Sequence, residues 1–282
     1  MSKRPVIVLA KTGDQHVGST LGLCPPEGVR LDDGGEYRPN KIQQWLYENW
    51  DNFWHARVQE TVRRHKAQLY VLFNGDARDT VGPGHHGTTQ VITANEESQA
   101  YLTDRVFGVV RALKPAKAFF VRGTEVHVGP SGSSEEALAR WFGAVRNPET
   151  ESWSSWHWRF RIYGKLIDAT HHTSMGNMPW TEQNAAIRLA ATVMMEYARR
   201  KEVAPDLVVR SHVHRTADSF KAYPTRALIL PCWQFQTGYA YRVNPNRLPD
   251  IGGAITVIAP DGQSETEMIV YPPDPPTIHE AA

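Results

Sequence analysis

The sequence has few of the features that would place it outside ordinary globular proteins. Its 282 residues include two cysteines, Cys24 and Cys232, too few for a disulfide framework and typical of a reducing cytoplasm. Lys and Arg total 31 against 30 Asp and Glu, so a net charge of +1 gives no general attraction for nucleic acid or an anionic membrane. Residues 1–10 lack a signal-peptide core, and no apolar run is long enough to cross a bilayer. We therefore expect a soluble, cytoplasmic protein without a membrane partner.

Short apolar segments alternate with helical patterns in the first half of the chain, and more strands follow. This order favours a layered α/β sandwich formed by a single domain, residues 1–272, with a loose proline-rich tail at 273–282. We expect Ser133 or Ser134 to cap the third helix and Thr181 to cap the fourth. The predicted strands are 5–10, 68–73, 117–121, 156–163, 165–169, 206–210, 227–231, 253–259 and 266–271, and the helices 40–65, 95–113, 133–145 and 181–201.

Five of these apolar strands end in residues that can bind metal ions. Ligands in open α/β sheets gather outside the carboxyl ends of the strands, so loops far apart in the sequence can meet at one site. Carboxylates mixed with imidazoles suit Mn, Fe, Zn or Co better than Ca, and the number of groups favours two ions. The five pairs are Asp14 and His16, Asp76 and Asp79, Glu125 and His127, His171 and His172, and His212 and His214.

The segments that carry these pairs resemble a family signature. DQH at 14–16, GDARD at 75–79, RGTEVH at 122–127, THH at 170–172 and SHVH at 211–214 are similar to DxH, GDxxD, GNH(D/E), H and GHxH of calcineurin-like metallophosphoesterases. The resemblance implies a four-layer β-sandwich flanked by helices and a metal-dependent phosphoesterase. It implies that one metal is held by Asp14, His16, Asp76 and His214, and that Asp76 bridges to a second metal held by His171 and His212.

The third motif departs from the family pattern. Thr124 and Glu125 stand where the family has its Asn ligand and acid His, and Ser211 replaces the usual Gly of the last motif. We expect Glu125, or else Thr124, to complete the second metal. His127 is the expected proton donor to the leaving group, with the member of the His171/His172 pair that does not bind metal as the alternative.

Two divalent ions about 3.5–4 Å apart would polarise a phosphoryl oxygen and activate a bridging hydroxide, with Asp76 between them. Mn is the expected metal, with Fe, Zn, Co and Ni as alternatives. The His-x-His ending is similar to nuclease and cyclic-nucleotide branches, so phosphodiesters are the favoured substrates, including nucleotides or nucleic acid. A phosphomonoesterase or protein phosphatase, a nuclease proper and a catalytically weakened metal-binding scaffold remain alternatives. The sequence does not fix the oligomeric state.

Other polar residues near the motifs have weaker assignments. Asp79 is expected to orient His16 or its loop. Arg78 and Arg122 are candidates to clamp a phosphate, or else ordinary surface arginines. His85 and His86 lie in a glycine-rich loop and either touch substrate or are solvated. The aromatic stripe of helix 40–65 is expected to pack in the core.

Overall fold

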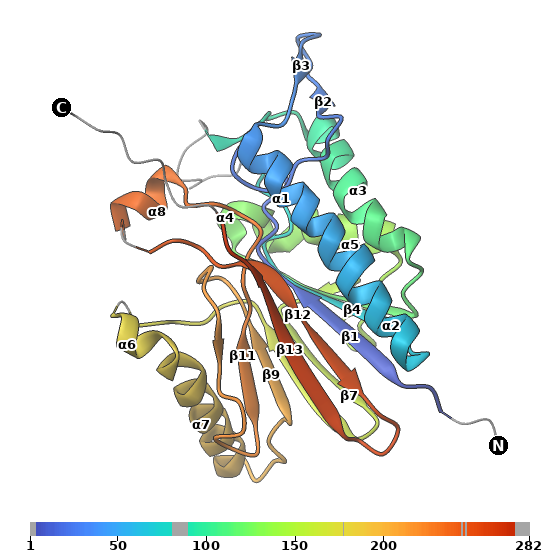
Figure 1. Cartoon of the computed structure of the whole chain (residues 1–282), viewed down its shortest axis with the longest axis vertical. Coiled ribbons are helices and arrows are strands. Elements are labelled where there is room, and N and C mark those ends of the chain that lie inside the picture. Colours follow the sequence, from blue (N-terminus) through green and yellow to red (C-terminus); the bar gives the residue numbers. More distant parts are fainter. Residues whose placement is uncertain (1–3, 81–89, 177, 244, 246, 274–282) are drawn as a thin grey trace.

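Two β-sheets form the centre of the computed structural model, which describes residues 4–80, 90–176, 178–243, 245 and 247–273 (Figure 1). The first sheet has six strands in the order β13 (Ser264–Tyr271), β12 (Ile251–Ile258), β1 (Ile7–Thr12), β4 (Gln68–Asn74), β5 (Lys117–Val121) and β6 (Ser154–Ser155). The second has five, in the order β10 (Ala217–Asp218), β11 (Arg226–Ile229), β9 (Leu207–Arg210), β8 (Lys165–Thr170) and β7 (His157–Ile162). A separate ribbon pairs β2 (Val29–Arg30) with β3 (Glu36–Tyr37).

Helices cover the outer face of each sheet, as Figure 1 shows. On the first sheet lie α1 (Lys41–Asp51), which continues through a π-helical segment (Asn52–Val58) into α2 (Gln59–His65), and also α3 (Glu96–Ala112) and α5 (Ser133–Phe142). On the second sheet lies α7 (Asn184–Arg199). The short helices are α4 (Glu125–Val128), a 3₁₀ turn (Pro130–Gly132), α6 (Pro179–Glu182) and α8 (Gly238–Val243). The predicted α/β sandwich flanked by helices is therefore confirmed, with the layers helix, sheet, sheet, helix.

The side-chain pattern of β1 explains this layering. Val8 and Ala10 pack in the core under the helices, while Ile7 and Leu9 pack in the core between the two sheets. Successive residues of a strand point to opposite faces, so a strand covered on both faces must be apolar throughout. The continuous apolar run that the sequence shows here is the mark of a central strand.

The strand directions bring the motif loops together. In the first sheet β1, β4 and β5 are parallel neighbours, and in the second β8 is parallel to β9. Parallel strands end at the same edge of their sheet, and the two edges face one another at the end of the sandwich near α4 and α8 (Figure 1). This common end holds the five predicted motifs.

Several local predictions were wrong or incomplete. Gly132, in a left-handed conformation and without a side-chain cap, precedes α5, so neither Ser133 nor Ser134 is its N-cap. Thr181 lies inside the short helix α6, because a break near Gln183 separates α6 from α7. Helix α8 and the two-residue strands were not predicted, since segments this short have little periodicity. The tail from residue 274 lies outside the described residues.

The aromatic stripe on the helix over the first sheet packs in the core, as expected. Trp50, Phe53 and Trp54 are fully buried, and Trp50 meets Trp233 edge to face with ring centroids 5.0 Å apart. Cys24 and Cys232 are both buried free thiols. Within the described segments, no helix has the length and apolar character needed to cross a membrane.

A buried carboxylate on β8 should make stability depend on acid. Burial opposes ionisation of Asp168, but hydrogen bonds from His157 and Arg210 and the Arg210 charge outweigh it and lower its pKa to about 2. Because the carboxyl pKa is lower in the folded than in the unfolded protein, ionised Asp168 stabilises the fold at pH values above the unfolded-state pKa. This contribution to the free energy of unfolding, about 2 kcal/mol, is lost as the pH falls toward 2. In urea unfolding, the stability gap between wild type and Asp168→Asn should narrow between pH 5 and pH 3. A gap that stays constant over this range would contradict the assignment.

Candidate metal centre

Five of the predicted ligands have an unusual backbone conformation. Asp14, His16, Asp76, His212 and His214 all have positive φ, between 44° and 76°. Residues other than glycine rarely adopt this left-handed region, and outliers of this kind concentrate at functional sites. Here the turns follow the ends of β1, β4 and β9 and direct the side chains toward one another. The surrounding hydrogen bonds hold these turns, for example from His16 N to the carbonyl of Asp76 at 2.9 Å.

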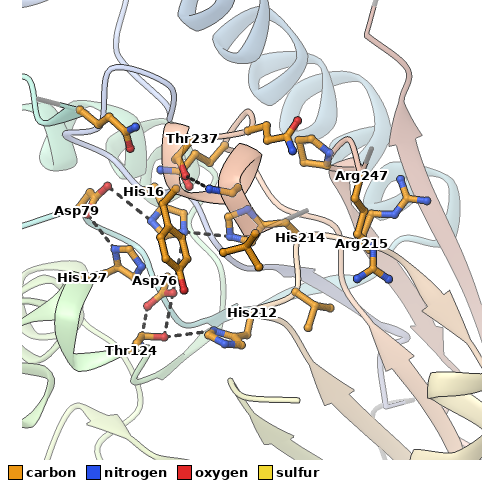
Figure 2. Close-up of a pocket in the computed structure, with 18 of the residues that line it drawn as sticks. His16, Asp76, Asp79, Thr124, His127, His212, His214, Arg215, Thr237 and Arg247 are labelled. Atoms are coloured by element: carbon orange, nitrogen blue, oxygen red, sulfur yellow. Dashed lines mark hydrogen bonds and ion pairs between the residues drawn. The ribbon is translucent and has the colours of Figure 1, made fainter. Parts of the chain in front are cut away.

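The first group of ligand atoms comes from the loops after β1 and β9. Asp14 Oδ1 lies 3.3 Å from His214 Nε2 and 4.0 Å from His16 Nε2, and the two imidazole Nε2 atoms are 3.2 Å apart. Asp14 and His16 are almost completely buried. These three residues form one of the candidate metal-binding groups, and Figure 2 shows His16 and His214 of this group.

The second group of ligand atoms lies beside the first and is centred on His171 and Asp76. His171 Nε2 is 3.0 Å from Asp76 Oδ2, and its Nδ1 is 2.7 Å from the carbonyl oxygen of Asn74. His171, His172 and His212 also form a compact set of imidazoles. Since Asp76 is within 3.9 Å of His16 as well, its carboxylate lies between the two groups.

The electrostatics of the cluster suit the binding of cations. Burial, then the charge of neighbouring imidazoles, lowers the pKa of His16 to about 3 and that of His212 to about 4, so both offer a neutral nitrogen. Burial opposes charging of His171, but Asp76 and Asp14 raise its pKa to about 10. Despite burial, the His171 charge holds the pKa of Asp76 well below its usual value. A bound cation would take the place of the His171 proton, because a ligating imidazole is neutral.

The donor set fits the implied divalent metals. Asp14 Oδ1 and His16 Nδ1 are buried without a hydrogen-bond partner among the described residues, which is costly unless another group satisfies them. Carboxylate oxygens with imidazole nitrogens are ligands for Mn, Fe, Co or Zn. The residues present are therefore suited to hold such ions.

The third motif brings Thr124, not Glu125, to the cluster. Thr124 N donates to Asp76 Oδ1 at 2.6 Å, and its Oγ1 is 3.3 Å from Asp76 Oδ2 and from His212 Nδ1 and 3.2 Å from His172 Nε2. Glu125 begins α4, is exposed, and belongs to none of the metal-binding groups among the described residues. The one-residue difference matters because the chain enters a helix here and turns the next side chain outward.

His127 lies on the other side of Asp76, against the first group. Its Nδ1 is 2.9 Å from Asp79 Oδ1, and its ring meets that of His16 edge to face at 4.6 Å. Burial opposes a charge on His127, but Asp79 and Asp76 outweigh it and raise its pKa. Asp79 also lies 4.0 Å from His16 Nδ1, so it contacts both imidazoles, as Figure 2 shows.

Sequence reasoning missed Glu135, which holds two of the motif loops together. This α5 carboxylate is 1% exposed and accepts hydrogen bonds from Ala77 N at 3.1 Å and Gly123 N at 2.6 Å. Burial, then the charge of Asp76, raises the pKa of Glu135 to about 8. A Glu in the first turn of a predicted helix was the available signal, but only the fold shows that it is buried and what it contacts.

Close approach of the same loops requires glycine at position 123. A Cβ atom there would lie 2.1 Å from Asp76 Oδ1 and 2.2 Å from its backbone nitrogen. In the last motif Ser211 fills the usual glycine position, is fully buried, and its Oγ accepts a hydrogen bond from Asn74 Nδ2 at 2.8 Å.

The two candidate phosphate-clamping arginines lie away from the cavity. Arg122 binds Ser154 Oγ at 2.9 Å and Glu136 at 3.3 Å, and Arg78 is buried 3.8 Å from Glu96. Neither lines the cavity at the cluster. His85 and His86 lie outside the described residues.

A cavity of about 450 Å³ opens beside the cluster. Its lining includes His16, Asp76, His127, His212 and His214. The other walls come largely from segments that the sequence did not suggest: Gln90, Met175, Arg215, Gln234, Gln236, Thr237, Tyr239, Ala240, Val243, Arg247, Leu248 and Pro249.

No family model matches the sequence, and no curated protein does. Among solved structures, Vps29 of Entamoeba histolytica with zinc is 11% identical in sequence, with a TM-score of 0.39. The match covers 93% of this chain and 98% of the Vps29 chain. An archaeal phosphodiesterase is 9% identical in sequence, with a TM-score of 0.38. The match covers 94% of this chain and 99% of the phosphodiesterase. A Candida albicans 5'-nucleotidase is 11% identical in sequence, with a TM-score of 0.40. The match covers 92% of this chain and 49% of the nucleotidase.

The order of the five motifs, the layers of the sandwich and the meeting of the motif loops at one end agree with the resemblance seen in the sequence. Two sheets between two layers of helices are the architecture that this resemblance implies. Against this background, the Thr124 loop is the part of the site that departs most from the family signature.

Proposed function

We propose that this protein is a metal-dependent phosphoesterase that hydrolyses phosphodiesters. The observation that supports it is the convergence of the carboxylates and imidazoles of four loops around Asp76, with donor atoms within 4.8 Å of one another in each group. Divalent ions held there would act as Lewis acids on a phosphoryl group and increase the acidity of a bound water.

We assign each residue a role by its position. Asp14, His16 and His214 would hold one ion, and His171 and His212 the other, with Asp76 available to both. His127 protonates the leaving oxygen, since its side chain is 24% exposed at the cavity and Asp79 orients its ring. Asp79 supports His16 and His127 together.

The charge of the cavity favours diesters over monoesters. Of the described residues that line it, the two arginines are already paired: Arg215 with Glu182 at 2.8 Å and with Asp250, and Arg247 with Glu182 at 2.9 Å. A monoester dianion would need unpaired cations beyond the metals, whereas a diester carries a single negative charge. The cavity also extends well past the metal groups and leaves space for a second ester substituent.

Hydrolysis of bis-p-nitrophenyl phosphate by metal-stripped protein, with Mn²⁺ restored, tests the proposal. We expect turnover that depends on the metal and exceeds the rate on p-nitrophenyl phosphate. Faster hydrolysis of the monoester would replace the diesterase by a phosphatase. Metal binding without turnover of either ester would favour the scaffold alternative.

We further propose that His172, with Thr124 Oγ1, completes the second ion in place of the family's Asn. His172→Ala should reduce bound Mn²⁺ from two ions to one, or weaken the second by about tenfold or more, because the His172 ring reaches Thr124 and lies 4.7 Å from that of His212. Metal counting and calorimetry measure this without any activity assay. His65→Ala, at the exposed end of α2, is the matched control. Glu125→Ala should keep both ions; if it loses one while His172→Ala does not, the first expectation for Glu125 is restored.

A further inference from the structure

The wall of the cavity formed by residues 232–237 is attached to the metal-site loops. Trp233 N donates to the carbonyl oxygen of Asp14 at 2.9 Å, and Phe235 N donates to that of Leu21 at 2.9 Å. The segment follows β11 after two residues and has no regular secondary structure. Its position relative to the candidate ligands is therefore fixed by the backbone.

The aromatic side chains of this segment pack in the protein interior. Trp233 packs in the core with Trp50, and Phe235 packs against Trp45 at a centroid distance of 5.6 Å. Gln234 and Gln236, in contrast, both line the cavity. Two amide side chains are thus placed in the cavity wall beside the metal centre.

Gln234 is built as a binding group. It is 3% exposed, lines the cavity, and its amide makes no hydrogen bond to any described residue. The amide reaches the cavity, so a ligand bound there can use both its donor and its acceptor. Gln236, at 8% exposed, is the second amide on the same wall.

The remaining walls suit a flat apolar ring. Tyr239 of α8 lines the cavity and is 41% exposed, and Val243, Leu248 and Pro249 add apolar surface. The paired Arg215 and Arg247 lie on the far side of His214 from Asp76, and Thr237 lies near His16 (Figure 2). An aromatic face, an apolar wall and fixed amides together are how proteins hold nucleobases.

We propose that Gln234 and Gln236 bind the base of a nucleoside phosphodiester whose phosphate lies at the metal centre. This rests on the proposed function and specifies its substrate class. A glutamine amide offers one donor and one acceptor side by side, which matches adjacent groups such as N6 and N7 of adenine. Tyr239 supplies a ring on which the base can stack.

Two diesters with the same leaving group test the proposal: adenosine 5'-(p-nitrophenyl phosphate) and methyl p-nitrophenyl phosphate. We expect kcat/KM to favour the nucleoside ester by about tenfold or more. Gln234→Leu, which keeps the volume and removes the amide, should reduce that preference about tenfold, mainly through KM. Gln236→Leu is the second variant. Gln263→Leu, on the exposed turn after β12, is the matched control and should leave the preference unchanged.

The outcomes separate this inference from the proposed function. Equal rates on the two esters, unaffected by Gln234→Leu, would overturn the nucleoside site and leave the phosphoesterase intact. If neither ester is hydrolysed, saturation-transfer NMR with adenosine still decides: contact signals from the base that weaken in Gln234→Leu support the site, and their absence in wild type overturns it. Cleavage of a dinucleotide but not of a ten-residue single strand would assign the site to free nucleotides, and cleavage of both to nucleic acid.

Discussion

Asp76→Asn is expected to abolish metal-dependent phosphodiester hydrolysis, with a loss of roughly a thousandfold or more in kcat. Asp76 is the carboxylate between the two groups of candidate ligands, 3.0 Å from His171 and 3.9 Å from His16. The amide keeps the shape but removes the negative charge that two cations would share. The measurement is turnover of bis-p-nitrophenyl phosphate alongside the number of Mn²⁺ ions bound per chain.

The matched control for this variant is Asp32→Asn, an exposed aspartate in the turn between β2 and β3. It should behave as wild type in both measurements. Asp76→Asn protein that binds two ions tightly and keeps more than a tenth of the turnover would remove Asp76 from the shared position.

Glu135→Gln should produce the second-largest effect although its side chain lies among the loops and not in the cavity. Glutamine has one carbonyl oxygen where Glu135 has two acceptors, so either Ala77 N or Gly123 N faces an NH₂ group. Each stranded buried N–H costs about 1–3 kcal/mol and loosens a loop that carries Asp76 or Thr124. We expect metal affinity to fall by about 10–100-fold, as it does when supporting groups behind metal ligands are removed.

Metal affinity and spectra distinguish this positioning role from a general loss of stability. Electron paramagnetic resonance of the Mn²⁺-loaded variant should show an altered signal at protein concentrations where circular dichroism still reports a folded chain. Glu136→Gln is a demanding control, since Glu136 neighbours Glu135 but binds Trp153 N, Ser154 and Arg122 instead. A Glu135→Gln protein with wild-type metal affinity and spectrum would show that the two loops hold their geometry without this carboxylate.

The Thr124 loop also shows how a family signature can mislead at single-residue level. By its spacing, the signature predicts either Thr124 or Glu125 at the altered ligand position. The backbone distinguishes them, because Thr124 precedes α4 in an extended conformation and Glu125 is its first helical residue. Only the conformation of the loop determines which of two adjacent side chains points inward.

The sequence by itself determined the layers of the fold and most of the metal-competent residues. Apolar strands buried on both faces must read as continuous apolar runs, and the loops after parallel strands must meet at one edge, so β1, β4, β5, β8 and β9 and their motifs were recognisable. The tertiary structure alone decided the rest: the contacts of Glu135, the outward position of Glu125, and the cavity wall at Gln234 and Gln236. The physical reason is that these depend on loop conformation and on contacts between distant segments, and isolated glutamates and glutamines carry no periodic pattern that marks their partners.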